Sequence, residues 1–230
     1  MKKAVILFSG GLDSTVTAAV AKSEGHELYL LTISYGQRHS IEVTHARQIA
    51  KWLEASEHKI LELDLRTFGG SALTANVEVP TDRLTQDRDS DIPVTYVPAR
   101  NTIFLSLALA YAEVLQTTKI FFGANIRDYS GYPDCRPEFV QAFMEVARRG
   151  TKLGVNGEEI KVLTPLILMT KAEIIQRGIA LHVPFHLTHS CYAPQRDGHV
   201  CGRCDSCQIR QEGFESAGIP DPALSATLDE

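Results

Sequence analysis

The sequence predicts an α/β fold in which helices cover both faces of a doubly wound parallel sheet. Two observations lead to this fold class. Short apolar runs typical of buried strands alternate along the chain with helical patterns, and strands that alternate with helices form parallel sheets. The first apolar run is followed at once by Ser9-Gly10-Gly11 and a helical pattern. A glycine turn between a strand and a helix is where ligand sites of such sheets begin.

Each element is expected from its own pattern. The helix at residues 41–53 has Ile41, His45, Ile49 and Trp52 at helical spacing, and a later helix carries Pro137 in its first turn. Strands are expected at residues 3–9, 28–34, 60–65 and 119–124, and helices at residues 13–23, 41–53, 102–115, 137–149 and 170–177.

Three segments need separate interpretations. Residues 170–177 begin with Thr-Lys-Ala-Glu, a capping-box start for a short helix. Residues 153–160 contain Gly154, Asn156 and Gly157 and predict a hairpin-like turn. Residues 81–91 contain four aspartates and two arginines, which is typical of a mobile surface loop and offers a lid as the alternative.

Composition restricts the class of protein. A chain of 230 residues with 44% hydrophobic and 22% charged residues is expected to form one soluble domain with a small appendage. It has no run of about 18 apolar residues, and the stretch after Lys2 and Lys3 is too short for a signal peptide, so a cytoplasmic location is expected. The 23 basic and 28 acidic residues, a net charge of −5, argue against nucleic acid and favour a small substrate.

The glycine turn predicts a phosphate site. Gly10 and Gly11 permit positive φ and let a polyphosphate approach the backbone, whose N–H groups meet the positive end of a helix dipole. Asp13 repels phosphate, so it is expected to hold Mg²⁺ or to orient a neighbouring group. Three neighbouring side chains add hydroxyl donors: Ser9, Ser14 and Thr15.

The type of phosphate loop follows from what the turn lacks. No lysine follows the glycines, as a kinase P-loop requires, and the dinucleotide G-x-G-x-x-G is also absent. An ordinary capped glycine turn is the alternative, but Ser-Gly-Gly-Leu-Asp-Ser resembles the PP-loop of the ATP pyrophosphatase family. The resemblance implies an adenine nucleotide alpha hydrolase-like fold that grips the β,γ-pyrophosphate while a substrate oxygen attacks the α-phosphate.

Four of the five cysteines lie near the end of the chain with the spacing C-x9-C-x2-C-x2-C. Four thiolates complete a closed, structural Zn²⁺ site, which here forms a small C-terminal subdomain. Disulfides do not fit a reducing compartment, and an iron–sulfur cluster is the rival, ranked below zinc because adenylation moves no electrons. His189 and His199 are alternative ligands. The expected zinc ligands are Cys191, Cys201, Cys204 and Cys207.

Further motifs lie after expected strands or, for residues 96–101, before the apolar helix. They are Tyr-Gly-Gln-Arg-His at residues 35–39, Tyr-Val-Pro-Ala-Arg-Asn at 96–101, Gly-Ala-Asn at 123–125 and Gly-Tyr-Pro-Asp-Cys-Arg at 131–136. With the PP-loop and the cysteines, they are similar to the 7-cyano-7-deazaguanine synthases of queuosine precursor synthesis. The resemblance covers nearly the whole chain. The PP-loop alone indicates only the superfamily, whereas residues 131–136 with the cysteine spacing are specific to these enzymes.

The resemblance implies an ATP-dependent ligase. Its substrates are ATP, 7-carboxy-7-deazaguanine and ammonia, its cofactors are Mg²⁺ with ATP and one structural Zn²⁺ per subunit, and it forms a homodimer. The chain is expected to consist of three parts: a PP-loop ATP-binding domain (1–185), a zinc-binding segment with a C-terminal helix (186–216) and a peripheral tail (217–230). The alternatives are a tRNA-modifying PP-loop enzyme and a non-catalytic zinc-ribbon regulatory protein.

The expected site residues are those at which this sequence matches the motifs of the resembled family. Asp13, Ser14 and Arg100 are the expected catalytic residues. ATP is expected on Phe8, Ser9, Gly10, Gly11, Leu12, Asp13, Ser14, Thr15, Val16, Thr17 and Ala18. The deazaguanine is expected on Asn101, Asp128, Tyr132, Asp134 and Arg136. Lys171 reaches phosphate or lies on a helix surface, and Cys135 forms a thioester or, as we favour, packs as a small buried hydrophobe.

Overall fold

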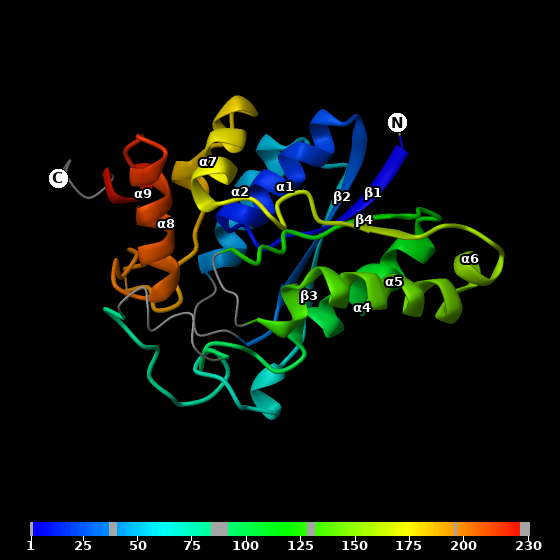
Figure 1. The fold of residues 1–230 in the computed structure, drawn as a ribbon, viewed down its shortest axis with the longest axis horizontal. Coiled ribbons are helices and arrows are strands. Elements are labelled where there is room, and N and C mark those ends of the chain that lie inside the picture. The colour runs from blue at the N-terminus through cyan, green and yellow to red at the C-terminus, as the bar shows by residue number, and fades with distance from the viewer. Residues whose placement is uncertain (1, 37–40, 84–91, 128–131, 196, 226–230) are drawn as a thin grey trace.

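The computed structural model describes residues 2–36, 41–83, 92–127, 132–195 and 197–225, and it confirms the predicted fold class. Five parallel strands form one sheet with the order β3-β2-β1-β4-β5 (Figure 1). The strands are β1 (Lys2–Leu7), β2 (His26–Ser34), β3 (Glu57–Glu62), β4 (Lys119–Phe121) and β5 (Lys161–Leu163).

Helices cover both faces of this sheet (Figure 1). One face packs against α1 (Leu12–Ser23) and α2 (Ile41–Trp52), and the other against α4 (Arg100–Val114) and α5 (Pro137–Gly150). Beyond α1 lie α7 (Lys171–Ala180) and α8 (Asp205–Ser216). The shorter helices are α6 (Lys152–Val155), α9 (Pro222–Ser225), η1 (Leu65–Thr67), η2 (Pro133–Cys135) and η3 (Phe185–Leu187).

Alternation along β1 explains the two-sided packing. Ala4 and Ile6 pack toward α1 and α2, whereas Val5 and Leu7 pack toward α4 and α5, because successive side chains of a strand point to opposite faces. All four are at most 7% exposed. A strand buried on both faces reads as a continuous apolar run, which is why the sequence predicted it clearly.

A third apolar cluster joins the C-terminal part of the chain to the main domain. Val16 of α1, Ile174 and Ile175 of α7, and Phe214 of α8 pack together, each at most 1% exposed. The helix α8 begins inside the cysteine-rich segment. The cysteine-rich segment is therefore fastened to the α/β domain through a helix with its own buried contacts.

Several expected boundaries shift in the structure. The strand expected at 60–65 begins at Glu57 instead. The capping box at Thr170 and Glu173 is confirmed. The expected hairpin near Gly157 is wrong: α6 and a turn lead into β5, which pairs in parallel with β4. Among the described residues, no helix is both long and apolar enough to cross a bilayer.

Candidate active site and four-cysteine cluster

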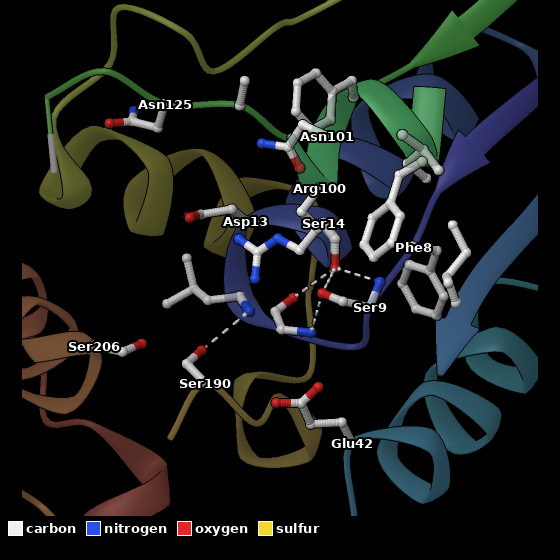
Figure 2. Close-up of a pocket in the computed structure, with 18 of the residues that line it drawn as sticks. Phe8, Ser9, Asp13, Ser14, Glu42, Arg100, Asn101, Asn125, Ser190 and Ser206 are labelled. Atoms are coloured by element: carbon white, nitrogen blue, oxygen red, sulfur yellow. Dashed lines mark hydrogen bonds between the residues drawn. The ribbon is translucent and has the colours of Figure 1, made fainter. Parts of the chain in front are cut away.

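The candidate site lies where the strand order reverses. The chain leaves β1 toward α1 and β2 on one side, whereas β4 lies on the other side of β1, and such a switch point opens a crevice at the carboxyl ends of the strands. A cavity of about 290 Å³ occupies it (Figure 2). Its walls come from the ends of β1, β2 and β4 and from the first turns of α1 and α4.

The predicted PP-loop forms the floor of this cavity (Figure 2). Gly10 has a φ of +80°, and a Cβ there would lie 2.8 Å from the Ala46 backbone nitrogen of α2, so only glycine fits. The Ser14 hydroxyl lies 3.0 Å from the Ser9 hydroxyl and accepts from the Ser9 N–H at 3.2 Å. Hydroxyls and the amino end of α1 therefore gather at one point, as anion binding requires.

The C-terminal segment braces this loop, which sequence reasoning missed. The His189 N–H donates to the Gly10 carbonyl at 3.2 Å, and the Leu12 N–H donates to the Ser190 hydroxyl at 3.5 Å (Figure 2). Tyr192 also lines the cavity. No local motif marks these residues, because they reach the loop only through folding; the nearby cysteines were the one available signal.

Asp13 forms an ion pair inside the cavity. The Lys171 ammonium lies 2.6 and 2.9 Å from the two carboxylate oxygens of Asp13. The Lys171 side chain is only 12% exposed. The helix-surface alternative for Lys171 is therefore wrong. Gly213 of α8 makes room for it, since a Cβ there would overlap the Lys171 side chain. Asn125 fixes the start of α7 by donating to two carbonyls of the preceding loop.

Arg100 begins α4 and points toward the PP-loop (Figure 2). Its guanidinium donates to the Tyr35 hydroxyl at 3.2 Å and lies 5.6 Å from the centre of that ring. Ala99, directly before it, has a φ of +54°, a left-handed conformation that costs a non-glycine residue about 1–2 kcal/mol. The half-buried Arg100 thus sits beside a strained turn, as functional residues often do.

The residues predicted to hold the deazaguanine divide into two groups. Tyr132 and Asn101 line the cavity with Arg100. Asp134 is buried, and its carboxylate accepts from the Asn101 N–H at 3.0 Å, which caps α4. Arg136 is exposed at the start of α5 and is not among the residues that line the cavity. Asp128 lies outside the described residues.

Cys135 lies in the wall of the cavity but is not an activated nucleophile. Burial raises the pKa of its thiol to about 12, with the Asp134 charge acting in the same direction. The Asn101 amide donates to its sulfur at 3.3 Å. A thiol with so high a pKa is almost entirely protonated at neutral pH, which favours the packing role over the thioester.

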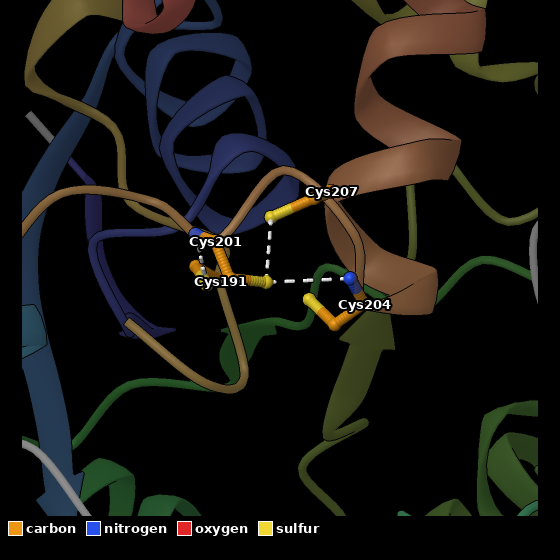
Figure 3. Close-up of side chains that lie close together, drawn as sticks. All are labelled: Cys191, Cys201, Cys204 and Cys207. Atoms are coloured by element: carbon orange, nitrogen blue, oxygen red, sulfur yellow. Dashed lines mark hydrogen bonds between the residues drawn. The ribbon is translucent and has the colours of Figure 1, made fainter. Parts of the chain in front are cut away.

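The four remaining cysteines form a compact cluster (Figure 3). All four sulfurs lie within 4.8 Å of one another, close to the spacing of about 3.8 Å that a tetrahedral site with Zn–S bonds of about 2.3 Å requires. Backbone N–H groups of Cys201, Arg203 and Cys204 donate to these sulfurs at 3.2–3.4 Å, which stabilises thiolates. The donor set therefore fits a closed, four-thiolate metal site.

A distant segment docks on the cysteine loop. Thr81 forms an isolated bridge with Cys204, and the Asp82 N–H donates to the Arg203 carbonyl at 2.9 Å. Asp82 also pairs with the Arg203 side chain, and Arg83 pairs with the buried Asp205 at 3.2 Å. Of the loop expected at 81–91, these three residues are described and 84–91 lie outside the described residues.

Comparison with known proteins identifies the family. The model of the queuosine biosynthesis protein QueC matches residues 3–218. The chain is 59% identical over 222 residues to a 7-cyano-7-deazaguanine synthase of Desulfatibacillum aliphaticivorans, covering 96% of this chain and 95% of that one. The chain belongs to the QueC family. A 7-cyano-7-deazaguanine synthase of Syntrophus aciditrophicus is 57% identical over 227 residues and 98% of both chains.

Membership of QueC confirms the family that the sequence motifs predicted. A similar fold also occurs in a solved structure of a protein with a different name. A solved 4-thiouridine synthetase in complex with RNA and ATP superposes with a TM-score of 0.52, at 20% identity, over 98% of this chain and 53% of that one. At this identity the likeness shows a shared fold and nothing about substrates. The QueC motifs and the cavity therefore supply the functional argument.

Proposed function

We propose that this chain is an ATP-dependent ligase that converts 7-carboxy-7-deazaguanine and ammonia into 7-cyano-7-deazaguanine for queuosine biosynthesis. One observation carries the proposal: in a QueC family member, the PP-loop and Arg100 face each other across one cavity. A phosphate cradle and a guanidinium suit a reaction between ATP and a carboxylate. The aromatic side chains around Arg100, among them Tyr35 and Tyr132, suit a flat bicyclic substrate.

Adenylation explains why a nitrile synthase needs this loop. Neither a carboxylate nor an amide has a good leaving group. A carboxylate oxygen attacks the α-phosphate and releases pyrophosphate; ammonia then replaces AMP to give the amide. The amide oxygen attacks the α-phosphate of a second ATP and releases a second pyrophosphate; loss of AMP and of both N–H protons then leaves the nitrile. The chain's task is to position the reactants and offset negative charge.

Each side chain has a defined part in this scheme. The loop N–H groups and the hydroxyls of Ser9 and Ser14 hold the β,γ-pyrophosphate. Arg100 orients the substrate carboxylate or offsets charge on the α-phosphate. Asp13 is the carboxylate that would hold Mg²⁺, a cation that neutralises polyphosphate when bound. Lys171 then transfers its contact from Asp13 to the pyrophosphate.

The cofactors and assembly belong to the same proposal. Zn²⁺ in the four-cysteine cluster is supported by the all-thiolate donor set and its N–H···S contacts. Such thiols suit a reducing, cytoplasmic compartment. A homodimer is expected from the base rate for oligomers, and its mass in solution, measured by light scattering, tests it.

The direct experiment is a reconstituted reaction. The protein is incubated with ATP, Mg²⁺, ammonium and 7-carboxy-7-deazaguanine, and the nitrile and pyrophosphate are quantified. We expect two pyrophosphates and two AMP for each nitrile. Release of ADP instead would replace the second adenylation with phosphorylation. If no pyrophosphate depends on the deazaguanine acid, the proposed reaction is wrong.

A further inference from the structure

Tyr192 joins the cysteine cluster to the cavity. It follows Cys191 directly, its backbone N–H donates to the Cys204 sulfur at 3.5 Å, and it packs with Val79 both against the cysteine cluster and against the edge of the main core. Its side chain nevertheless lines the cavity that holds the PP-loop. One residue is thus fixed to the metal ligands by its backbone and faces the reactants with its side chain.

The surroundings of Tyr192 suit recognition of a flat, polar heterocycle. Arg100 lines the cavity together with three tyrosines, Tyr35, Tyr132 and Tyr192, and donates to the Tyr35 hydroxyl at 3.2 Å. Tyr132 hydrogen bonds to Tyr192 and shares a hydrogen bond of 2.9 Å with Thr95. Aromatic faces stack on a bicyclic ring, hydroxyls pair with its polar edge, and a guanidinium meets its carboxylate. A deazaguanine acid presents such a bicyclic ring, such a polar edge and such a carboxylate.

The segment that contacts the PP-loop is supported by hydrogen bonds that do not involve the cysteine cluster. The guanidinium of Arg210, on α8, donates to the carbonyls of Phe185 and Thr188 and pairs with the buried Asp221. These bonds hold the segment that leads to the PP-loop brace at His189 and Ser190. None of them involves a cysteine. Loss of metal should therefore release Tyr192 before it releases the phosphate cradle.

We propose that Tyr192 is a substrate-contacting residue and that the four-cysteine cluster sets its position, so metal loading controls affinity for the deazaguanine acid far more than affinity for ATP. The proposal rests on the proposed function, because it assigns a contact to that substrate. It gives the metal a role in recognition beyond holding the segment in place.

The first test uses side-chain variants and binding of 7-carboxy-7-deazaguanine by calorimetry, with a non-hydrolysable ATP analogue present. Tyr192→Ala should weaken binding at least about tenfold, since it removes the ring and the hydroxyl. Tyr192→Phe, which keeps the ring, should weaken it about 2- to 10-fold, the value of one hydrogen bond. In both variants the KM for ATP should stay within about twofold while the KM for the acid rises. Equal affinity of Tyr192→Ala and wild type for the acid would overturn the proposal.

The matched control is Tyr29→Phe. The Tyr29 hydroxyl donates to Glu27 on β2, away from the cavity, so its loss should leave affinity for the acid unchanged. Zinc content and the melting temperature establish that each variant is folded. If Tyr29→Phe weakened acid binding as much as Tyr192→Phe, the loss would not be specific to the site, and the assignment of Tyr192 would be wrong.

The second test removes the metal from the whole protein with a chelator. We expect the affinity for the acid to fall at least about tenfold, the affinity for the ATP analogue to change at most about threefold, and Zn²⁺ to restore both. An equal fall in both affinities, or no change in either, overturns the metal-dependent part. If metal-loaded wild type fails to bind or convert the acid at all, the proposed function fails instead.

Discussion

At the scale of single residues, the most consequential contact is the ion pair between Asp13 and Lys171, which lie 158 positions apart in the chain. A carboxylate in a phosphate loop repels the nucleotide unless a cation accompanies it. Lys171 supplies that cation at the first position of α7, where the capping box fixes the helix start. Unlike the lysine of a kinase P-loop, which follows the glycines directly, Lys171 comes from a helix that is distant in the sequence.

Lys171→Met should lower turnover at least about 100-fold, the usual loss when one charge-stabilising donor leaves a reaction centre. The neutral side chain leaves Asp13 unpaired beside the phosphates. The measurement is pyrophosphate release at saturating substrates. Lys22→Met, which removes an exposed pair with Glu54, is the control and should retain wild-type turnover. Turnover above a tenth of wild type in Lys171→Met would exclude a role for this lysine in charge neutralisation.

Cys135 offers a prediction from its pKa. Burial raises the pKa from an ordinary 9.0 to about 12, so at pH 8 the thiolate fraction is about 1000-fold below that of an unperturbed cysteine. Alkylation by iodoacetamide should be slower by at least that factor than in the denatured chain, as mass spectrometry can measure. Cys135→Ser should keep most of its turnover. Rapid alkylation, or loss of turnover in the serine variant, would instead favour the thioester.

The same pKa sets the sign of a stability change with pH. The folded chain holds the Cys135 proton more tightly than the unfolded chain does, so this group's contribution is fully present below pH 9. It is then lost as the pH rises toward 12, at up to about 1.4 kcal/mol per pH unit. Urea unfolding at pH 8 and pH 10 should show a smaller alkaline loss in Cys135→Ser than in wild type.

At the scale of elements, the packing of α8 on α7 positions Lys171. Gly213→Ala introduces a methyl group that overlaps the Lys171 side chain. Overpacking of this kind costs about 1–3 kcal/mol, more than the helix propensity of alanine returns. We expect a lower melting temperature together with lower turnover, because the lysine must move. Gly150→Ala is the matched control: its methyl meets nothing within 4 Å, and both quantities should stay near wild type.

Local patterns in the sequence predicted most elements but not their contacts. The strand β1 and the loop after it were readable because a strand buried on both faces and a glycine turn are local signals. The first residues of β3 were missed because Glu57, His58 and Lys59 are polar. In the described part of the chain β3 is an edge strand that pairs with β2 alone, so polar side chains are tolerated there. The three-residue β5 was too short to stand out.

For the candidate site, too, the sequence predicted local features but not the contacts between distant segments. The four cysteines lie within 17 positions of one another in the printed sequence, so their spacing alone predicted the cluster that folding confirms. Ser190 and Tyr192 lie beside that cluster, yet no pattern says that this segment crosses to the PP-loop. Asp134 illustrates the converse. Its carboxylate was assigned to the substrate, and that assignment stays a prediction, but the structure adds a helix cap that no sequence pattern indicated.

At the scale of the whole molecule, the apolar cluster of α1, α7 and α8 joins the C-terminal part of the chain to the α/β domain, and two polar features hold the C-terminal part together: the cysteine cluster and the pair of Arg210 with Asp221. Both side chains of that pair are at most 6% exposed. Asp221 lies in the segment expected to be peripheral, and its burial indicates that this part of the segment has a structural role.

Asp221→Ala should destabilise the protein by about 3–5 kcal/mol, because it leaves the Arg210 charge buried without its partner. Urea unfolding measures the change. Asp64→Ala removes an exposed pair with Arg66 and should cost at most about 1 kcal/mol. A similar, small loss in both variants would mean that other groups compensate the Arg210 charge and that the pair does not hold the C-terminal part together.

Removal of the metal should loosen one region rather than unfold the chain. The sheet and its helices bury two apolar clusters of their own, whereas the described part of residues 191–204 packs mainly around the small cysteine cluster, and Tyr192 alone among these described residues also contacts the main core. Amide hydrogen exchange after chelation should therefore accelerate in residues 79–83 and 191–204, which meet at the Thr81–Cys204 bridge, while β1 and β2 keep their protection. Uniform loss of protection across the sheet would show that the metal supports the global fold, and then metal loading could not act selectively on Tyr192.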